Sequence, residues 1–169
     1  VVPKESKPGE RRVAATPKTV EQLRALGYDV AVETGAGAAA SYPDSAFAAA
    51  GAQIVLPAAA YDGDIVFKVN PPTASERMRL RDGQTLVSLL APALDPGAVE
   101  ALRGQGVTAL AMDAVPRISR AQALDVLSSM ANLGGYRAVI EAAGEYGGLF
   151  TGQVTAAGKV PPAKVLVVG

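Results

Sequence analysis

Short runs of apolar, β-branched residues alternate with amphipathic stretches along most of this chain. The runs lie at 28–33, 53–56, 64–69, 85–90 and 107–112, and turns of a few residues separate them from the stretches between. This alternation is typical of a parallel sheet with helices on its faces and right-handed crossovers. The sequence therefore predicts the α/β class, with a Rossmann-like parallel β/α subdomain over residues 1–118.

Helix signals fall in the stretches between the runs. Thr16 can cap a helix, Pro17 suits the first helical position, and Gly27 ends the pattern. Similar signals predict helices at 44–50, 75–81 and 96–103.

The organisation changes after Pro116. Residues 119–145 contain no Pro, and an apolar stripe that includes Leu124, Leu127 and Leu133 runs along them. We expect one long helix from about 119 to 146, with a kink at Gly134-Gly135. Residues 153–160 read as a hairpin, so 119–162 would connect two subdomains.

The last residues, Lys164–Gly169, form an apolar run that ends in Gly. Such a run is how a buried parallel strand leads into a glycine-rich phosphate loop, although any buried strand before a turn glycine has the same pattern. A full G-x-G-x-x-G motif would extend beyond Gly169. We expect residues 163–169 to be the first strand of a truncated NAD-binding Rossmann subdomain.

Composition narrows the chemistry. The 169 residues include no His and no Cys, which excludes disulfides, thiolate catalysis, a His zinc site and a Ser-His pair. The 16 basic and 16 acidic residues give no indication of a nucleic-acid partner. No apolar stretch reaches the ~18 residues of a membrane span. What remains is chemistry by carboxylates, amides, Arg, Lys and hydroxyls, or the positioning of a cofactor.

The densest polar group lies in the expected long helix. Arg117 precedes it, and Gln122, Asp125 and Ser128 follow at spacings of three, so they share roughly one face. An amide, a carboxylate and a hydroxyl on one face can hydrogen-bond a carboxamide or a ribose. The alternative is a solvated helix face, with Ser119 or Asp113 as the cap of its N-terminus.

Two further features carry charge near strand ends. Residues 4–12 include Lys4, Glu5, Glu10, Arg11 and Arg12 and follow the first strand, where open α/β sheets place ligands. An ordinary charged loop has the same composition. Lys68 interrupts an apolar run, so it must be paired or reach solvent at the strand end. A phosphate loop at 35–37 is weakly supported, because no third glycine follows at the needed spacing.

Seven blocks of the sequence form a recognisable set: Val2–Glu5, Arg11–Pro17, Glu33–Gly37, Pro116–Gln122, Leu127–Asn132, Gly135–Val139 and Thr155–Pro162. Together they resemble the alpha subunit of proton-translocating NAD(P) transhydrogenases, and the N-terminal blocks are shared with the related alanine dehydrogenases.

The resemblance implies an NAD(H)-binding domain of two subdomains, with a cleft in which Arg117, Gln122, Asp125 and Ser128 surround the nicotinamide and its ribose. It implies a homodimer at the cytoplasmic face of the bacterial inner membrane, whose membrane contacts are made by other parts of the complex. A partner domain on the beta subunit would carry NADP(H), and hydride transfer would be coupled to proton translocation. A chain that stops at Gly169 would then be an inactive fragment, with a few N-terminal residues also missing.

An alanine-dehydrogenase-like oxidoreductase is the first alternative. Arg12 and Lys68 match the pyruvate-binding positions of alanine dehydrogenases, but their catalytic His has no counterpart in residues 89–92 or elsewhere. Direct hydride transfer between two nicotinamides needs positioning and exclusion of water rather than a general acid on the protein. A non-catalytic nucleotide-sensing or assembly domain is the other alternative.

Overall fold

The computed structural model describes residues 1–168, so the predicted phosphate-loop glycine, Gly169, lies outside the described residues. The chain divides into two compact units, Val1–Asp125 and the part that begins at Val126.

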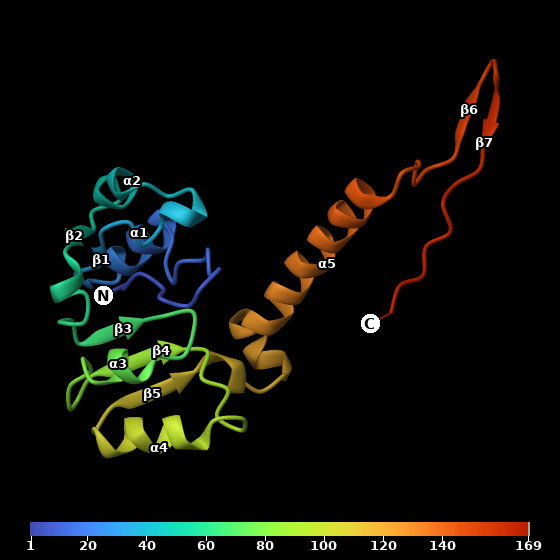
Figure 1. The fold of residues 1–169 in the computed structure, drawn as a ribbon. Coiled ribbons are helices and arrows are strands. Elements are labelled where there is room, and N and C mark those ends of the chain that lie inside the picture. Colours follow the sequence, from blue (N-terminus) through green and yellow to red (C-terminus); the bar gives the residue numbers. More distant parts are fainter. Residues whose placement is uncertain (169) are drawn as a thin grey trace. The chain divides into compact units, whose positions relative to one another are not determined.

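The first unit is built on parallel strands (Figure 1), which confirms the predicted α/β class. Strand β1 (Ala31–Glu33) pairs with β2 (Gln53–Val55), and β3 (Ile65–Phe67) pairs with β4 (Thr85–Ser88), which pairs in turn with β5 (Thr108–Ala111). All three pairings are parallel. Each strand lies within one of the apolar runs that predicted it.

The first residues of the chain join these two groups of strands. The Val2 amide donates to Ala31 O at 2.8 Å, and the Glu33 amide donates to Val2 O at 3.0 Å. On the other side, the Phe67 amide donates to Val1 O at 2.9 Å. The N-terminal segment therefore lies between β1 and β3 and bonds to both.

The resulting strand order is β2, β1, the N-terminal segment, β3, β4, β5. Successive strands run outward in one direction from the N-terminal segment to β2, and in the opposite direction from β3 to β5. The order therefore reverses between the N-terminal segment and β3. In open α/β sheets, ligands bind beyond the carboxyl ends of the strands at such a switch point.

The helices follow the signals that predicted them. Helix α1 (Pro17–Ala25) begins with Pro17, and the Thr16 side chain accepts a hydrogen bond from the Thr19 amide. Gly27 follows with φ +93°, a conformation that glycine adopts without strain. The other α-helices of this unit are α2 (Asp44–Ala49), α3 (Ala74–Arg77) and α4 (Pro96–Gly104), and its 3₁₀ turns are η1 (Ala38–Ala40), η2 (Pro57–Ala59), η3 (Met112–Ala114) and η4 (Ser119–Leu124).

Two apolar clusters form the core of the first unit. Phe47 and Val32 lie at the centre of one, and Leu86 and Leu102 at the centre of the other. The two clusters correspond to the two groups of strands, so each group has apolar packing of its own.

The prediction of one helix over residues 119–146 is wrong. Residues Ser119–Leu124 form the 3₁₀ helix η4, and Asp125 leaves the helical region with φ −77° and ψ 82°. Helix α5 (Val126–Glu145) begins after this break and runs through Gly134 and Gly135. The absence of Pro permits a helix but does not distinguish 3₁₀ from α geometry, which is why the break escaped the sequence pattern.

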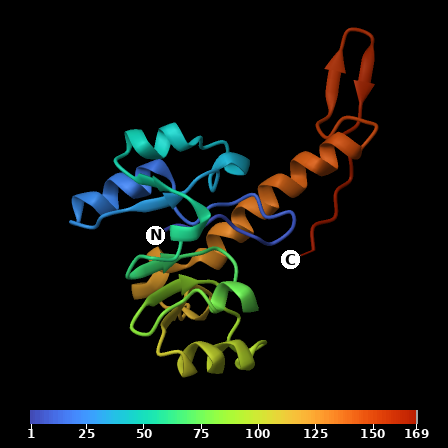
Figure 2. The ribbon, with the colours of Figure 1, turned by 60° about the vertical axis from the view of Figure 1, so that its left-hand side comes forward.

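The second unit contains α5 and the predicted hairpin, formed by β6 (Gln153–Thr155) and β7 (Gly158–Val160) in antiparallel pairing (Figure 2). Residues 161–168 belong to no helix or strand. The predicted strand at 163–169 is therefore not formed within the described residues, and its place in a second sheet stays a prediction. Across residues 1–168, no helix combines the length and the hydrophobicity needed to cross a bilayer.

Candidate functional site

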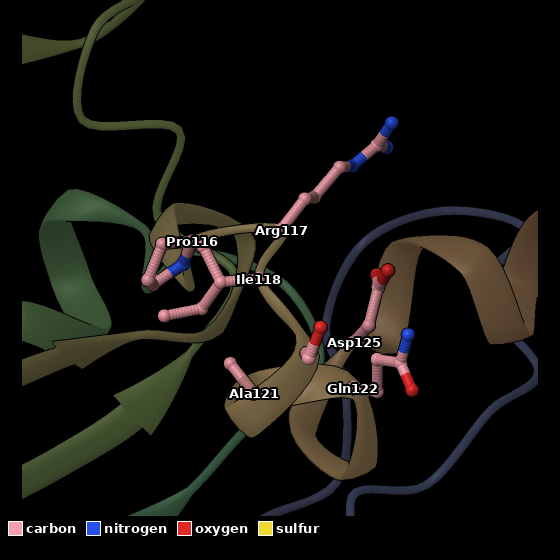
Figure 3. A pocket seen from close by; sticks show the side chains of 7 residues that line it. Pro116, Arg117, Ile118, Ala121, Gln122 and Asp125 are labelled. Atoms are coloured by element: carbon pink, nitrogen blue, oxygen red, sulfur yellow. The ribbon is translucent and has the colours of Figure 1, made fainter.

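A pocket of about 380 Å³ follows β5 and its short turn η3 (Figure 3). It is lined by Pro116, Arg117, Ile118, Ser119, Ala121, Gln122 and Asp125. All of these residues belong to the first unit. Because the chain reaches them from the carboxyl end of β5, the pocket lies where parallel sheets present their ligand-binding loops.

The 3₁₀ geometry of η4 explains why this pocket is polar. Side chains three residues apart eclipse each other in a 3₁₀ helix, because it has three residues per turn. Ser119, Gln122 and Asp125 have that spacing, and the Asp125 amide donates to Gln122 O at 3.2 Å. The shared face predicted for Gln122 and Asp125 is thus present, although the predicted α-helical stripe is not.

The lining has a polar and an apolar side. The polar groups of Arg117, Gln122 and Asp125 lie to the right in Figure 3, and Ile118 and Ala121 lie to the left. The guanidinium and the amide offer N–H donors, and the carboxylate offers acceptors. The arrangement can hold a flat, polar-edged ring against an apolar wall.

Sequence reasoning missed the apolar part of the lining. The side chains of Pro116, Ile118 and Ala121 have no reactive or hydrogen-bonding group. Only their position in the sequence, next to Arg117 and Gln122, could have indicated that they line the pocket. Ser128, by contrast, lies near the start of α5, in the second unit, and is not part of the lining. Its role beside the other three residues stays a prediction.

A second polar group lies at the switch point of the sheet, and we call it the switch-point cluster. Its centre is Lys68, whose side chain is only 1% exposed. The ammonium lies 3.0 Å from Glu76 Oε1 and 3.4 Å from Glu5 Oε2. Of the two placements expected for this lysine, the structure shows the paired one. The cluster comprises Glu5, Glu10, Arg12, Lys68, Asn70 and Glu76.

Glu5 ties the first loop of the chain to the end of β3. Its carboxylate accepts hydrogen bonds from the Val69 amide at 2.7 Å and from Asn70 Nδ2 at 3.2 Å. Glu76 has a second task, because it forms a capping box with Thr73 at the start of α3. Burial opposes ionisation of Glu76, but the Thr73 amide and the Lys68 ammonium hold its pKa below the usual value.

Glu10 and Arg12 form the outer part of the cluster. The guanidinium donates to both carboxylate oxygens, with Nη2 to Oε2 at 2.7 Å and Nε to Oε1 at 2.9 Å. These bonds are the main reason that the pKa of Glu10 falls to about 2, and a bond from Asn70 adds to them. Each charged group of the cluster thus has an opposite charge on the chain itself.

Comparison with known protein families identifies the family of this chain. The family described as alanine dehydrogenase/PNT, N-terminal domain, matches residues 1–134. The chain belongs to this family.

The relatives of this chain include transhydrogenases and alanine dehydrogenases. It is 58% identical to the NAD(P) transhydrogenase subunit alpha of Haemophilus influenzae over 168 residues, which is 99% of the chain and 33% of that subunit. The crystal structure of transhydrogenase from Sinorhizobium meliloti matches it with a TM-score of 0.91 and 44% identity, over 96% of this chain and 47% of the other. A solved L-alanine dehydrogenase matches with a TM-score of 0.80 and 31% identity, over 90% and 44%. The chain therefore spans a third to a half of these relatives.

Proposed function

We propose that this chain is part of the NAD(H)-binding component of a proton-translocating transhydrogenase, and that the pocket at Pro116–Asp125 receives the nicotinamide end of NAD(H). The observation that carries the proposal is the pocket itself. Three side chains with the donors and acceptors that a carboxamide and a ribose need line one side of it, and apolar residues line the other. The identity to a transhydrogenase alpha subunit favours this cofactor.

The residues fit the cofactor in chemical type. The guanidinium of Arg117 and the amide of Gln122 can donate to the carboxamide oxygen, and Asp125 can accept from a ribose hydroxyl or from the carboxamide nitrogen. We add Ser128 as a fourth ligand. The bound nicotinamide supplies the hydride; the protein orients it and keeps water away, so no residue of this chain needs to act as an acid or base.

The rest of the proposed machinery lies outside this chain. NADP(H) would be held by a partner domain on the beta subunit, against which the nicotinamide pocket must open. Coupling to proton translocation and attachment to the cytoplasmic face of the inner membrane would be supplied by other parts of the complex. The name of the H. influenzae relative, a subunit alpha, supports an assembly of several subunits.

The alanine-dehydrogenase-like alternative has support from the solved L-alanine dehydrogenase. Its substrate, however, would need a cation at the switch point. There Lys68 already contacts Glu5 and Glu76, and Arg12 contacts Glu10. A carboxylate ligand would have to compete with these carboxylates for the two cations, which favours the transhydrogenase proposal.

The test is kinetic and uses the complete subunit together with its NADP(H)-binding partner. Arg117→Ala, Gln122→Ala and Asp125→Asn should lower the transhydrogenation rate, by up to about 100-fold where the nicotinamide shifts by ~1 Å. The NADH dissociation constant should change much less, because the adenosine and pyrophosphate would be bound elsewhere. Arg120→Ala is the matched control, since Arg120 is exposed and does not line the pocket. Near-normal rates in all three variants would contradict the proposal.

We also propose that the protein is a homodimer. No residue of α5 is fully buried, and Tyr136, Val139 and Val154 are each more than half exposed. A two-stranded hairpin is marginal without further packing, so a second subunit is the expected cover for both elements. Sedimentation of the complete subunit should give a dimer, and a monomer at high micromolar concentration would count against this.

A further inference from the structure

The backbone hydrogen bonds between β4 and β5 stop at the ends of the strands, and beyond them a side chain accepts the next amides. The two strands are in register with a constant offset, and their last backbone pair is Ser88 with Ala111. At the same offset Leu90 would face Asp113. The backbone cannot pair there, because the chain turns into η3 at Met112. Instead the Asp113 carboxylate accepts the Leu90 amide at 3.0 Å and the Ala91 amide at 2.6 Å.

This contact holds a strained residue. Ala91 has φ +46°, in the left-handed region that non-glycine residues adopt at a cost. Its carbonyl accepts the amides of Leu94 and Asp95, at 2.8 and 3.0 Å, so Ala91 forms the turn that leads to α4. A conformation of this kind persists only where the surroundings fix it, and strained backbone concentrates at functional sites.

The carboxylate that fixes Ala91 lies just upstream of the pocket. Asp113 precedes Pro116 by three residues, and the backbone bonds that follow are local ones, such as Ile118 N to Pro116 O at 2.9 Å and Ala121 N to Ile118 O at 2.9 Å. These local bonds shape the pocket segment. The two bonds of Asp113 tie its upstream end to the turn that follows β4.

We infer that Asp113 is a positioning residue for the pocket: its carboxylate clamps the turn at Leu90-Ala91 and thereby holds the segment Pro116–Asp125 in place over the carboxyl ends of β4 and β5. The clamp itself rests on the contacts above. Its consequence for hydride transfer rests on the proposed function, so the experiment reads the two separately.

The first measurement is amide hydrogen exchange in the full-length protein. Asp113→Ala should speed exchange at Leu90, Ala91 and residues 117–124 by at least about tenfold, since each lost bond is one to a charged acceptor. Asp113→Asn keeps one acceptor oxygen and the size of the side chain, so it should raise the exchange rates less than Asp113→Ala does. It also serves as the test if the alanine variant does not fold. Asp95→Ala is the matched control, because Asp95 caps α4 by accepting the Ala98 amide at 2.9 Å and is not part of the pocket lining.

A second variant tests the part played by Ala91. Glycine adopts a left-handed conformation without the penalty of a side chain. Combined with Asp113→Ala, Ala91→Gly should therefore partly restore slow exchange at Leu94 and Asp95, whose amides donate to Ala91 O, while exchange at residues 117–124 stays fast because the carboxylate is still missing. No restoration would overturn the link between the clamp and the strained turn. Exchange at 117–124 that rises no more in the Asp113 variants than in Asp95→Ala would overturn the clamp.

The second measurement is transhydrogenation with the NADP(H)-binding partner. Asp113→Ala should lower the turnover rate by about tenfold or more while leaving NADH affinity nearly unchanged, and Asp95→Ala should leave both near the wild-type values. Faster exchange in the pocket segment with a normal rate would uphold the clamp and contradict the nicotinamide assignment. Slower turnover without faster exchange would overturn the positioning role.

Discussion

The switch-point cluster and the pocket at Pro116–Asp125 contain the same kinds of polar groups in opposite settings. The Lys68 side chain is buried and has two carboxylate partners, whereas Arg117 and Gln122 are exposed to solvent and line a pocket. A buried ion has lost its hydration and depends on its partner, so it is not available to a ligand. The comparison teaches that burial and pairing, rather than residue type, separate the structural charges of this fold from those that face a ligand.

The largest expected effect comes from removing the central charge of the switch-point cluster. Lys68→Met keeps an apolar stem of similar length but leaves Glu5 and Glu76 buried beside each other without a cation. We expect a loss of about 3–5 kcal/mol in the free energy of unfolding, measured by urea denaturation. The matched substitution in the pocket, Arg117→Met, should stay within about 0.5 kcal/mol of wild type. Equal losses of stability in the two variants would contradict the distinction between the two regions.

Local signals in the sequence were sufficient for most of the fold. Thr16 and Pro17 start α1 where the capping rules place it, and the apolar runs lie over the observed strands. Such rules act over a few residues, which is why they succeed. They failed at Asp125, because a spacing of three fits both a 3₁₀ helix and one face of an α-helix.

The functional groupings were only half predictable for a different reason. Gln122 and Asp125 are close in sequence, so their shared face could be foreseen. The contacts of Lys68 with Glu5 and of Asp113 with Ala91 join residues 63 and 22 positions apart. Only the order of the strands brings these residues together, and local pattern carries no information about that order.

A smaller effect should appear when the outer part of the cluster is titrated. The pKa of Glu10 is about 2 in the folded protein and near 4.5 in the unfolded chain, mainly because of its bonds from Arg12. Its contribution to stability is therefore complete above about pH 4.5 and is lost as the pH falls through about 2. Glu10→Gln should lower stability at neutral pH by less than Lys68→Met does, because Arg12 reaches solvent. The gap between Glu10→Gln and wild type should close as unfolding is measured at progressively lower pH; a constant gap would contradict this.

The smallest effect tests pairing without burial. Glu100 and Arg103 on α4 form an ion pair at 2.5 Å, closer than either contact of Lys68, yet their side chains are 63% and 76% exposed. In that setting water and salt screen the attraction, and holding two long side chains in one geometry costs entropy. Arg103→Gln, which keeps helix propensity nearly constant, should shift the midpoint of urea unfolding less than any variant above. What shift there is should disappear in high salt, whereas the Lys68→Met effect should persist because that pair is buried. If Arg103→Gln lowered stability as much as Lys68→Met does, pairing alone would explain the stability of the switch-point cluster. Burial would then not be needed to distinguish the cluster from the pocket.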